Sequence, residues 1–326
     1  MQNKIPTTIF SGFLGSGKTT IITHLIDTLQ QRGEQVIYIK NEIGDTDIDS
    51  RVLEGKGIKT KELLNGCICC TLVGPFISAI TEVVETFNPD RIIIEASGAA
   101  DPSALALMVS SHPLLERDGV IVIIDVVNFT GYKDLTITSQ NQTKFTDLVV
   151  FNKVELVDLQ QKRAVVGYVR ELNSHSPIIE APQGKVAPEV IFGLNQTELN
   201  LLLASIPAQT QSSETHHSLD AEHAHSDHID QDEIQAFTLF SKNTYSQEAM
   251  ESFLKSLPDN IFRAKGYITT RDNNLYIFNT VGKRTTFTQA PENFDTIDKN
   301  SAVLVCIGYH ANEYETEINS KLQAIR

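Results

Sequence analysis

Gly12–Thr20 reads GFLGSGKTT and stands directly after the apolar run Ile5–Ser11. The stretch has the form G-x-x-x-x-G-K-T, and a helical pattern follows it over residues 18–31. A strand, such a loop and a helix in this order are typical of a phosphate-binding loop, because the glycines let successive backbone N–H groups point at phosphate oxygens. The positive end of the helix dipole adds to the attraction. The pattern predicts that the chain binds a nucleoside triphosphate, and the alternative is a glycine-rich turn with a chance lysine.

The side chains of this loop have separate expected roles. Lys18 should be the only mobile cation aimed at the β- and γ-phosphates, and the Thr19 hydroxyl should hold Mg²⁺. The other positions expected to bind the nucleotide are Gly12, Gly15, Ser16, Gly17 and Thr20.

Apolar runs alternate with helical patterns over the first two-thirds of the chain. The expected strands are 5–11, 36–40, 91–95, 120–125, 148–151 and 177–181, and helices are expected over 18–31, over 73–87 and from Asp101-Pro102 onward. This alternation predicts an α/β fold, a P-loop NTPase with a mostly parallel sheet and helices on both faces.

Length and composition predict two domains joined by a linker. A chain of 326 residues exceeds the size of most single cores. We expect a nucleotide-binding domain over 1–208, a flexible linker rich in His and acidic residues over 209–232, and a smaller C-terminal α+β domain over 233–326. The strands expected in this last domain are 234–240, 262–270, 275–280, 285–289 and 302–308, with helices over 247–256 and 312–325.

The net charge of −14 argues against a nucleic-acid partner that is bound through its phosphates. Half of that charge lies in residues 209–233, which hold seven acidic side chains and neither Lys nor Arg.

The apolar runs are all shorter than the ~20 residues that span a bilayer. The first expected strand also begins too early to leave room for a secretory signal. We therefore expect a cytoplasmic protein without a membrane partner.

Glu95-Ala96-Ser97-Gly98 follows an expected strand and has the form E-x-x-G. An acid at the end of a buried strand can orient Mg²⁺, and the glycine N–H can approach the γ-phosphate, which couples hydrolysis to loop movement. A solvated acid at a strand end is the alternative.

Asn152-Lys153-Val154-Glu155 resembles the N-K-x-D motif by which GTPases read guanine. In that motif the carboxylate accepts hydrogen bonds from the guanine N1–H and 2-amino groups, and the lysine stem packs along the base. Glu155 is one methylene longer than Asp, so selectivity over adenine is less secure. An Asn-Lys pair on a surface loop is the alternative.

Three of the four cysteines crowd into Cys67-Ile68-Cys69-Cys70. Adjacent thiolates are soft ligands that suit Zn²⁺, Co²⁺, Ni²⁺ or Cu⁺. Three sulfurs leave one tetrahedral position open, as a metal-delivery site requires. Buried structural cysteines or a redox pair are the alternatives, and Cys306 is interpreted as a core residue.

Five of the nine histidines lie in the expected linker, where they alternate with acidic residues: His216, His217, His223, His225 and His228. Such a segment can hold Zn²⁺ or Ni²⁺ loosely and exchangeably, and the alternative is a polar linker that happens to be rich in His. The scattered histidines, His24 among them, are interpreted as structural.

Together these residues resemble the CobW-type family of P-loop GTPases, which are metallochaperone-like proteins related to the nickel-insertion GTPases of hydrogenase and urease. The resemblance covers most of the chain. It rests on matches to the family patterns G-F-L-G-x-G-K-T-T at Gly12–Thr20, G-C-x-C-C-T at Gly66–Thr71, E-x-S-G-x-A-D-P at Glu95–Pro102, N-E-F-G within Asn41–Asp49 and R-x-K-G at Arg263–Gly266. Ile43 stands where the family usually has Phe.

The resemblance implies GTP hydrolysis coupled to the binding and transfer of a transition metal. It makes Cys67, Cys69 and Cys70 the metal thiolates, and Asn152, Lys153 and Glu155 the guanine contacts. It also places Glu42, Asp45 and Asp49 in a segment that senses the γ-phosphate, where any of the three can position water.

We therefore expect a GTPase metallochaperone that delivers a metal to a client metalloprotein, with zinc favoured and cobalt or nickel open. A metal buffer or sensor that uses nucleotide only as a regulatory ligand is the main alternative, and a small-molecule kinase is a weaker one. Related GTPases often dimerise with nucleotide, so a nucleotide-dependent homodimer is also considered.

Overall fold

The computed structural model describes residues 4–41, 59–62, 73–97, 101–131, 137–194, 234–290 and 302–325. The chain divides into two compact units between Phe192 and Gly193. Each unit holds one β-sheet, with seven strands in the first and five in the second, among the residues described.

The first unit is built on a sheet in which every described pair of neighbouring strands is parallel, as predicted. Its strand order is β3-β2-β4-β1-β5-β6-β7. The strands are β1 (Ile5–Ser11), β2 (Val36–Asn41), β3 (Lys59–Glu62), β4 (Arg91–Ala96), β5 (Leu115–Asp125), β6 (Leu148–Asn152) and β7 (Ile178–Ala181).

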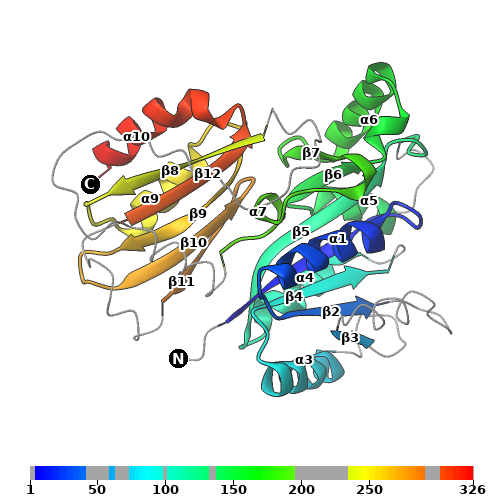
Figure 1. Cartoon of the computed structure of the whole chain (residues 1–326), viewed down its shortest axis with the longest axis horizontal. Coiled ribbons are helices and arrows are strands. Elements are labelled where there is room, and N and C mark those ends of the chain that lie inside the picture. The colour runs from blue at the N-terminus through cyan, green and yellow to red at the C-terminus, as the bar shows by residue number, and fades with distance from the viewer. Residues whose placement is uncertain are drawn as a thin grey trace. The chain divides into compact units, whose positions relative to one another are not determined.

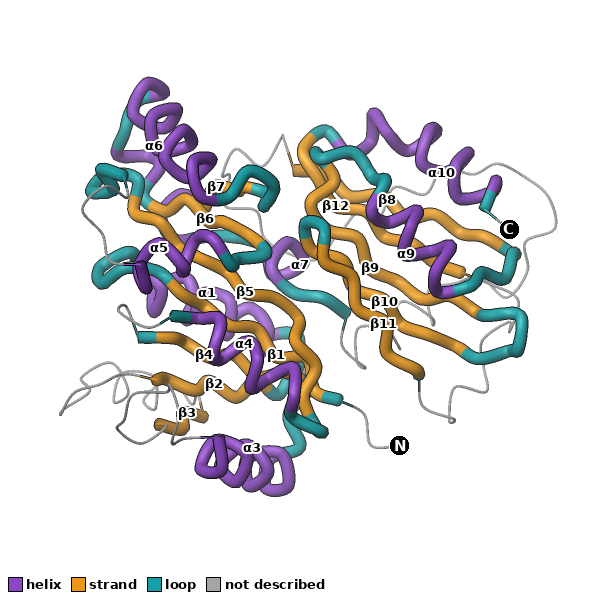
Figure 2. Tube along the Cα trace, turned by 180° about the vertical axis from the view of Figure 1, so that it is seen from behind, coloured by secondary structure: helices purple, strands orange, loops and turns teal. Residues whose placement is uncertain are grey.

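Helices cover both faces of this sheet, which confirms the predicted fold class. The helix α1 (Lys18–Gln31) and the short α7 (Pro188–Ile191) lie on one face (Figure 1). The helices on the other face (Figure 2) are α3 (Val73–Phe87), α4 (Pro102–Ser111), α5 (Ile137–Lys144) and α6 (Leu159–Leu172). As expected, α4 begins after Asp101, whose carboxylate accepts a hydrogen bond from the Ser103 N–H at 2.9 Å.

Strand register decides which side chains face α1. Residues paired directly across neighbouring parallel strands point to the same side of the sheet. Glu95 of β4 is paired with Phe10 of β1 and with Lys40 of β2, so these three side chains share the α1 face. The alternate residues, such as Ile9 and Ile94, pack into the core under α3 and α4.

Two strands differ from expectation. The strand β3 was not predicted, because its sequence Lys-Thr-Lys-Glu has no apolar alternation. It lies at the sheet edge and pairs only with β2 among the described strands. The strand β5 begins at Leu115, five residues before the expected start at 120, because its charged residues are paired rather than solvated: Arg117 bonds Asp147 and Asp118 bonds Arg91.

The second unit is an antiparallel sheet with strand order β11-β10-β9-β12-β8. Its strands are β8 (Ile234–Ser241), β9 (Ile261–Thr269), β10 (Leu275–Val281), β11 (Arg284–Gln289) and β12 (Ala302–Tyr309), with helices α9 (Gln247–Lys255) and α10 (Glu315–Ala324). This agrees with the expected smaller α+β domain.

Cys306 is fully buried in the core of the second unit, as predicted, and burial raises the pKa of its thiol. Gly266 has no room for a side chain, because an added Cβ would lie 1.9 Å from the Val303 carbonyl oxygen.

Within the described ranges, every helix is too short or too polar to cross a membrane.

A buried ion cluster anchors the start of β4. The Arg91 side chain has no exposed surface, its Nη1 donates to Asp118 Oδ2 at 3.0 Å, and its Nε lies 3.8 Å from Glu34 Oε2. Its guanidinium also stacks over the Phe192 ring, with 4.5 Å from Cζ to the ring centroid. Thr8 donates a further hydrogen bond to Asp118.

We expect Arg91→Met to lower the free energy of unfolding by about 3–5 kcal/mol, because two buried carboxylates lose their cation. Urea denaturation followed by circular dichroism measures the change. Lys162→Met is the matched control, because it breaks an ion pair in which the Lys162 and Glu180 side chains are 26% and 43% exposed. Loss of this pair should lower the free energy of unfolding by less than about 1 kcal/mol. Equal losses for the two variants would contradict a structural role for the Arg91 cluster.

Candidate nucleotide-binding site

A cavity of about 770 Å³ opens at the carboxyl ends of the parallel strands of the first unit. It brings together the three predicted nucleotide motifs, since its lining includes Lys18, Glu95 and Asn152. Ligands of open α/β sheets commonly bind at this edge, because the loops that leave the strands converge there.

The phosphate-binding loop requires glycine at two positions for different steric reasons. Gly12 has φ +141°, and an added Cβ would lie 2.4 Å from the Ile123 carbonyl oxygen. Gly17 has φ +95°, and an added Cβ would lie 2.1 Å from Asn152 Nδ2. Both values of φ are also unfavourable for residues with a side chain. The loop is therefore fixed against β5 on one side and β6 on the other.

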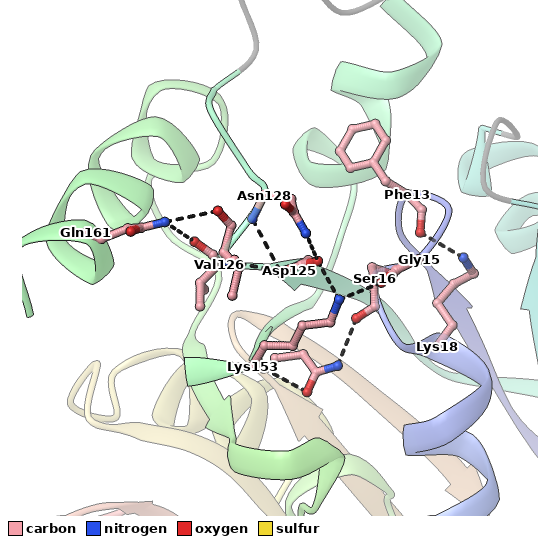
Figure 3. Close-up of polar contacts among 11 residues, drawn as sticks. Phe13, Gly15, Ser16, Lys18, Asp125, Val126, Asn128, Lys153 and Gln161 are labelled. Carbon is pink, nitrogen blue, oxygen red and sulfur yellow. Dashed lines mark hydrogen bonds and ion pairs between the residues drawn. The ribbon is translucent and has the colours of Figure 1, made fainter. Parts of the chain in front are cut away.

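Lys18 lies at the first turn of α1 and is 7% exposed. Its Nζ donates hydrogen bonds to the carbonyl oxygens of Gly12 at 2.9 Å and Phe13 at 3.1 Å, and the latter is drawn in Figure 3. The ammonium is thereby held on the loop at the cavity wall. Thr20, another predicted contact, also lines the cavity.

Thr19 and Glu95 place oxygen atoms side by side in the cavity. The Thr19 hydroxyl lies 3.3 Å from each Glu95 carboxylate oxygen, and the Tyr38 hydroxyl donates to Oε2. Burial raises the pKa of Glu95, although Tyr38 and Lys18 act in the opposite direction. Mg²⁺ prefers oxygen ligands, so this pair fits the predicted metal role.

Asn152 and Lys153 tie the end of β6 to the phosphate-binding loop. Asn152 Nδ2 donates to the Ser16 carbonyl oxygen at 2.8 Å. Lys153 Nζ donates to Asp125 Oδ2 at 2.6 Å and to the Gly15 carbonyl oxygen at 3.1 Å (Figure 3). Burial favours the neutral form of Asp125, but hydrogen bonds from Lys153 and from Asn128 hold its pKa below the usual value.

The turn Pro182–Gly184 forms a wall of the cavity that sequence reasoning missed. Gln183 has φ +53°, and its N–H donates to Glu155 Oε2 at 3.0 Å. The Gly184 carbonyl oxygen lies 3.1 Å from His24 Nδ1, and His24, which was interpreted as structural, also lines the cavity. The sequence signal was Pro-Gln-Gly directly after a strand, which marks a turn.

Tyr38, Lys40 and Asp125 are further site residues that the motifs did not identify. Lys40 lines the cavity together with Lys18, although no motif pointed to it. The available signal was a lysine near the end of an otherwise apolar strand.

The remaining predicted site residues lie outside the described ranges, and their roles stay predictions. They are Glu42, Asp45, Asp49, Cys67, Cys69, Cys70, Gly98, His216, His217, His223, His225 and His228.

Comparison with known families gives two matches. Residues 6–180 match the family described as CobW/HypB/UreG, nucleotide-binding domain. Residues 234–326 match the family described as cobalamin synthesis protein cobW C-terminal domain. The first match contains the cavity motifs, and the second contains the described strands and helices of the second unit.

Three relatives cover between 60% and 84% of this chain. The zinc chaperone CobW of Sinorhizobium sp is 30% identical over 301 residues, which cover 82% of each chain. The zinc-regulated GTPase metalloprotein activator 1 of Schizosaccharomyces pombe is 27% identical over 309 residues, covering 84% of this chain and 74% of the relative. The zinc chaperone YjiA of Escherichia coli is 27% identical over 203 residues, covering 60% of this chain and 63% of the relative. The chain therefore belongs to the CobW/HypB/UreG family of P-loop GTPases.

Proposed function

We propose that this chain hydrolyses GTP in the cavity of its first unit and uses the nucleotide cycle to deliver zinc to a client protein. The observation that carries the proposal is the meeting of Lys18, Glu95 and Asn152 around one cavity. The relatives that are named zinc chaperones and a zinc-regulated GTPase support the cargo and the client.

The phosphate end of the cavity binds the nucleotide through backbone N–H groups and Lys18. Lys18 Nζ already donates two hydrogen bonds to loop carbonyls, and phosphate oxygens replace these acceptors when nucleotide binds. Thr19 and Glu95 would hold Mg²⁺, which when bound neutralises charge on the β- and γ-phosphate oxygens. Glu95 is kept in place by the Tyr38 hydroxyl.

The opposite end reads the base through Glu155. The Gln183 N–H fixes one carboxylate oxygen at 3.0 Å, and a carboxylate has further acceptor capacity. Guanine offers N1–H and 2-amino donors to that carboxylate, whereas adenine has no hydrogen-bond donor at N1 or at C2. The extra methylene of Glu155 is accommodated because the turn Pro182–Gly184 lies beside it and orients its carboxylate.

The roles outside the described residues complete the proposal. Gly98 offers its N–H to the γ-phosphate, and one acid among Glu42, Asp45 and Asp49 positions the attacking water. The thiolates of Cys67, Cys69 and Cys70 bind the cargo metal. Zinc is favoured for this site, with cobalt or nickel as the alternatives. The His-rich segment, residues 216–228, adds weaker and exchangeable binding.

We expect Lys18→Ala to abolish nearly all GTP hydrolysis, because it removes the cation of the phosphate-binding loop while the loop backbone stays. Phosphate release under single-turnover conditions measures the loss. Lys162→Ala is the control, because it also removes one positive charge but lies outside the cavity lining. It should keep the wild-type rate of GTP hydrolysis. Wild-type turnover by Lys18→Ala would show that this cavity does not hydrolyse GTP.

Glu155→Gln should erode the preference for GTP over ATP. A hydrogen bond to a charged group contributes ~1.5–3 kcal/mol, so discrimination should fall by about one to two orders of magnitude. Competition binding of the two nucleotides measures the ratio. Glu171→Gln, an exposed change on α6, should leave the ratio unchanged. Equal affinity of the wild-type chain for ATP and GTP would refute the guanine assignment.

Replacing Cys67, Cys69 and Cys70 with Ser should remove one tight zinc site, whereas deleting residues 214–229 should remove only weak, multiple-ion binding. Anaerobic zinc titration measures both, with GDP and with a non-hydrolysable GTP analogue. A nucleotide-driven cycle requires the zinc affinity with GDP and the zinc affinity with the GTP analogue to differ by about 5–150-fold. By reciprocity, bound zinc must change the ratio of the two nucleotide affinities by the same factor. Identical zinc affinities in both nucleotide states would favour a metal buffer over a delivery cycle.

A further inference from the structure

Lys40 lies near the carboxyl end of β2 and lines the same cavity as Lys18. It is 6% exposed. Its Cα is paired with that of Glu95 across β2 and β4, which puts the two side chains on the α1 face of the sheet. A buried ammonium group is costly unless an opposite charge accompanies it, and Glu95 supplies that charge.

The strand order shows which residues lie at each end of the cavity. From one side to the other, the strands run β2, β4, β1, β5, β6. The cavity residues follow that order: Lys40 on β2, Glu95 on β4, Lys18 after β1 and Asn152 on β6. Asn152 and Glu155 mark the base end, so a nucleotide that passes Lys18 extends its phosphates toward Glu95 and Lys40.

Charge balance at that end favours an anion. Lys18 and Lys40 bring two positive charges to the cavity wall around the single carboxylate of Glu95, counted over the residues that the structure describes there. The terminal phosphate of a nucleoside triphosphate carries the negative charge that such a wall attracts, and a lysine binds phosphate as a point charge.

We propose that Lys40 is a second phosphate-binding cation, which contacts the terminal phosphate of the bound nucleoside triphosphate. This inference rests on the proposed function, and it adds a residue that distinguishes the triphosphate from the diphosphate. Lys18 contacts the β-phosphate, which both nucleotides carry, as well as the γ-phosphate, whereas Lys40 contacts only the γ-phosphate. The end of β2 thereby becomes a detector of the γ-phosphate.

The test compares Lys40→Met with the wild-type full chain. Calorimetric titration with GDP and with a non-hydrolysable GTP analogue, both with Mg²⁺, gives the two affinities. Hydrogen bonds to charged groups contribute ~1.5–3 kcal/mol, so the analogue should bind about 10- to 100-fold more weakly. GDP affinity should change by less than about threefold. Lys40→Arg keeps the charge and should retain most of the preference for the analogue.

Lys162→Met removes a lysine outside the cavity lining and should change neither affinity. Lys40→Gln is the second variant, because it keeps a polar end if Lys40→Met does not fold, and circular dichroism checks both. An equal loss for GDP and the analogue, or no loss for either, would overturn the assignment of Lys40 to the terminal phosphate. If the wild-type chain binds no GTP analogue at all, the proposed function itself fails, which is a different result.

Discussion

The hydrogen bond from Asn152 Nδ2 to the Ser16 carbonyl oxygen is the contact on which the site depends. It brings the end of β6 so close to the phosphate-binding loop that Gly17 has no room for a Cβ. Lys153 repeats the connection through the Gly15 carbonyl oxygen. The bond joins Asn152, which is proposed to contact the base, to a loop residue 136 positions away in the sequence. The residues proposed to contact the two ends of a nucleotide are therefore bonded to each other directly.

The strand β4 carries buried charge at two places, Arg91 and Glu95, and each has a different consequence. Arg91 at the start of the strand is surrounded by Asp118, Glu34 and the Phe192 ring, and its contacts are internal to the fold. Glu95 near the end of the strand is also buried, but it lines a cavity together with its neighbours Thr19 and Lys40. Buried ions commonly give little net stability. The Arg91 cluster therefore serves to position the strand, whereas the charges at Glu95 are available to a ligand.

The sequence was sufficient for elements whose signal is local. Apolar strands such as β1 and β4, the glycine spacing of the loop and the Asp101 cap were all predictable, because each depends on neighbouring residues. The edge strand β3 was not, since its polar sequence is held in place by pairing with β2. Gln183 and Lys40 were missed for the same reason. Their importance comes from a cavity that assembles residues from distant strands, and no spacing within the sequence records that assembly.

The position of Lys40 links the proposed contact with the γ-phosphate to the proposed metal ligands Cys67, Cys69 and Cys70. The strands β2 and β4 lie side by side and carry Lys40 and Glu95 near their ends. The two segments proposed to sense phosphate, Asn41–Asp49 and Glu95–Gly98, begin at these same strand ends in the sequence. The strand β3, paired with β2, precedes the cysteine motif by only a few residues. If Lys40 contacts the terminal phosphate as proposed, that contact lies on the edge of the sheet formed by β3, β2 and β4. Allosteric coupling requires a shared element that both ligands bias, and this edge is the described part of the chain that adjoins both proposed sites in the sequence.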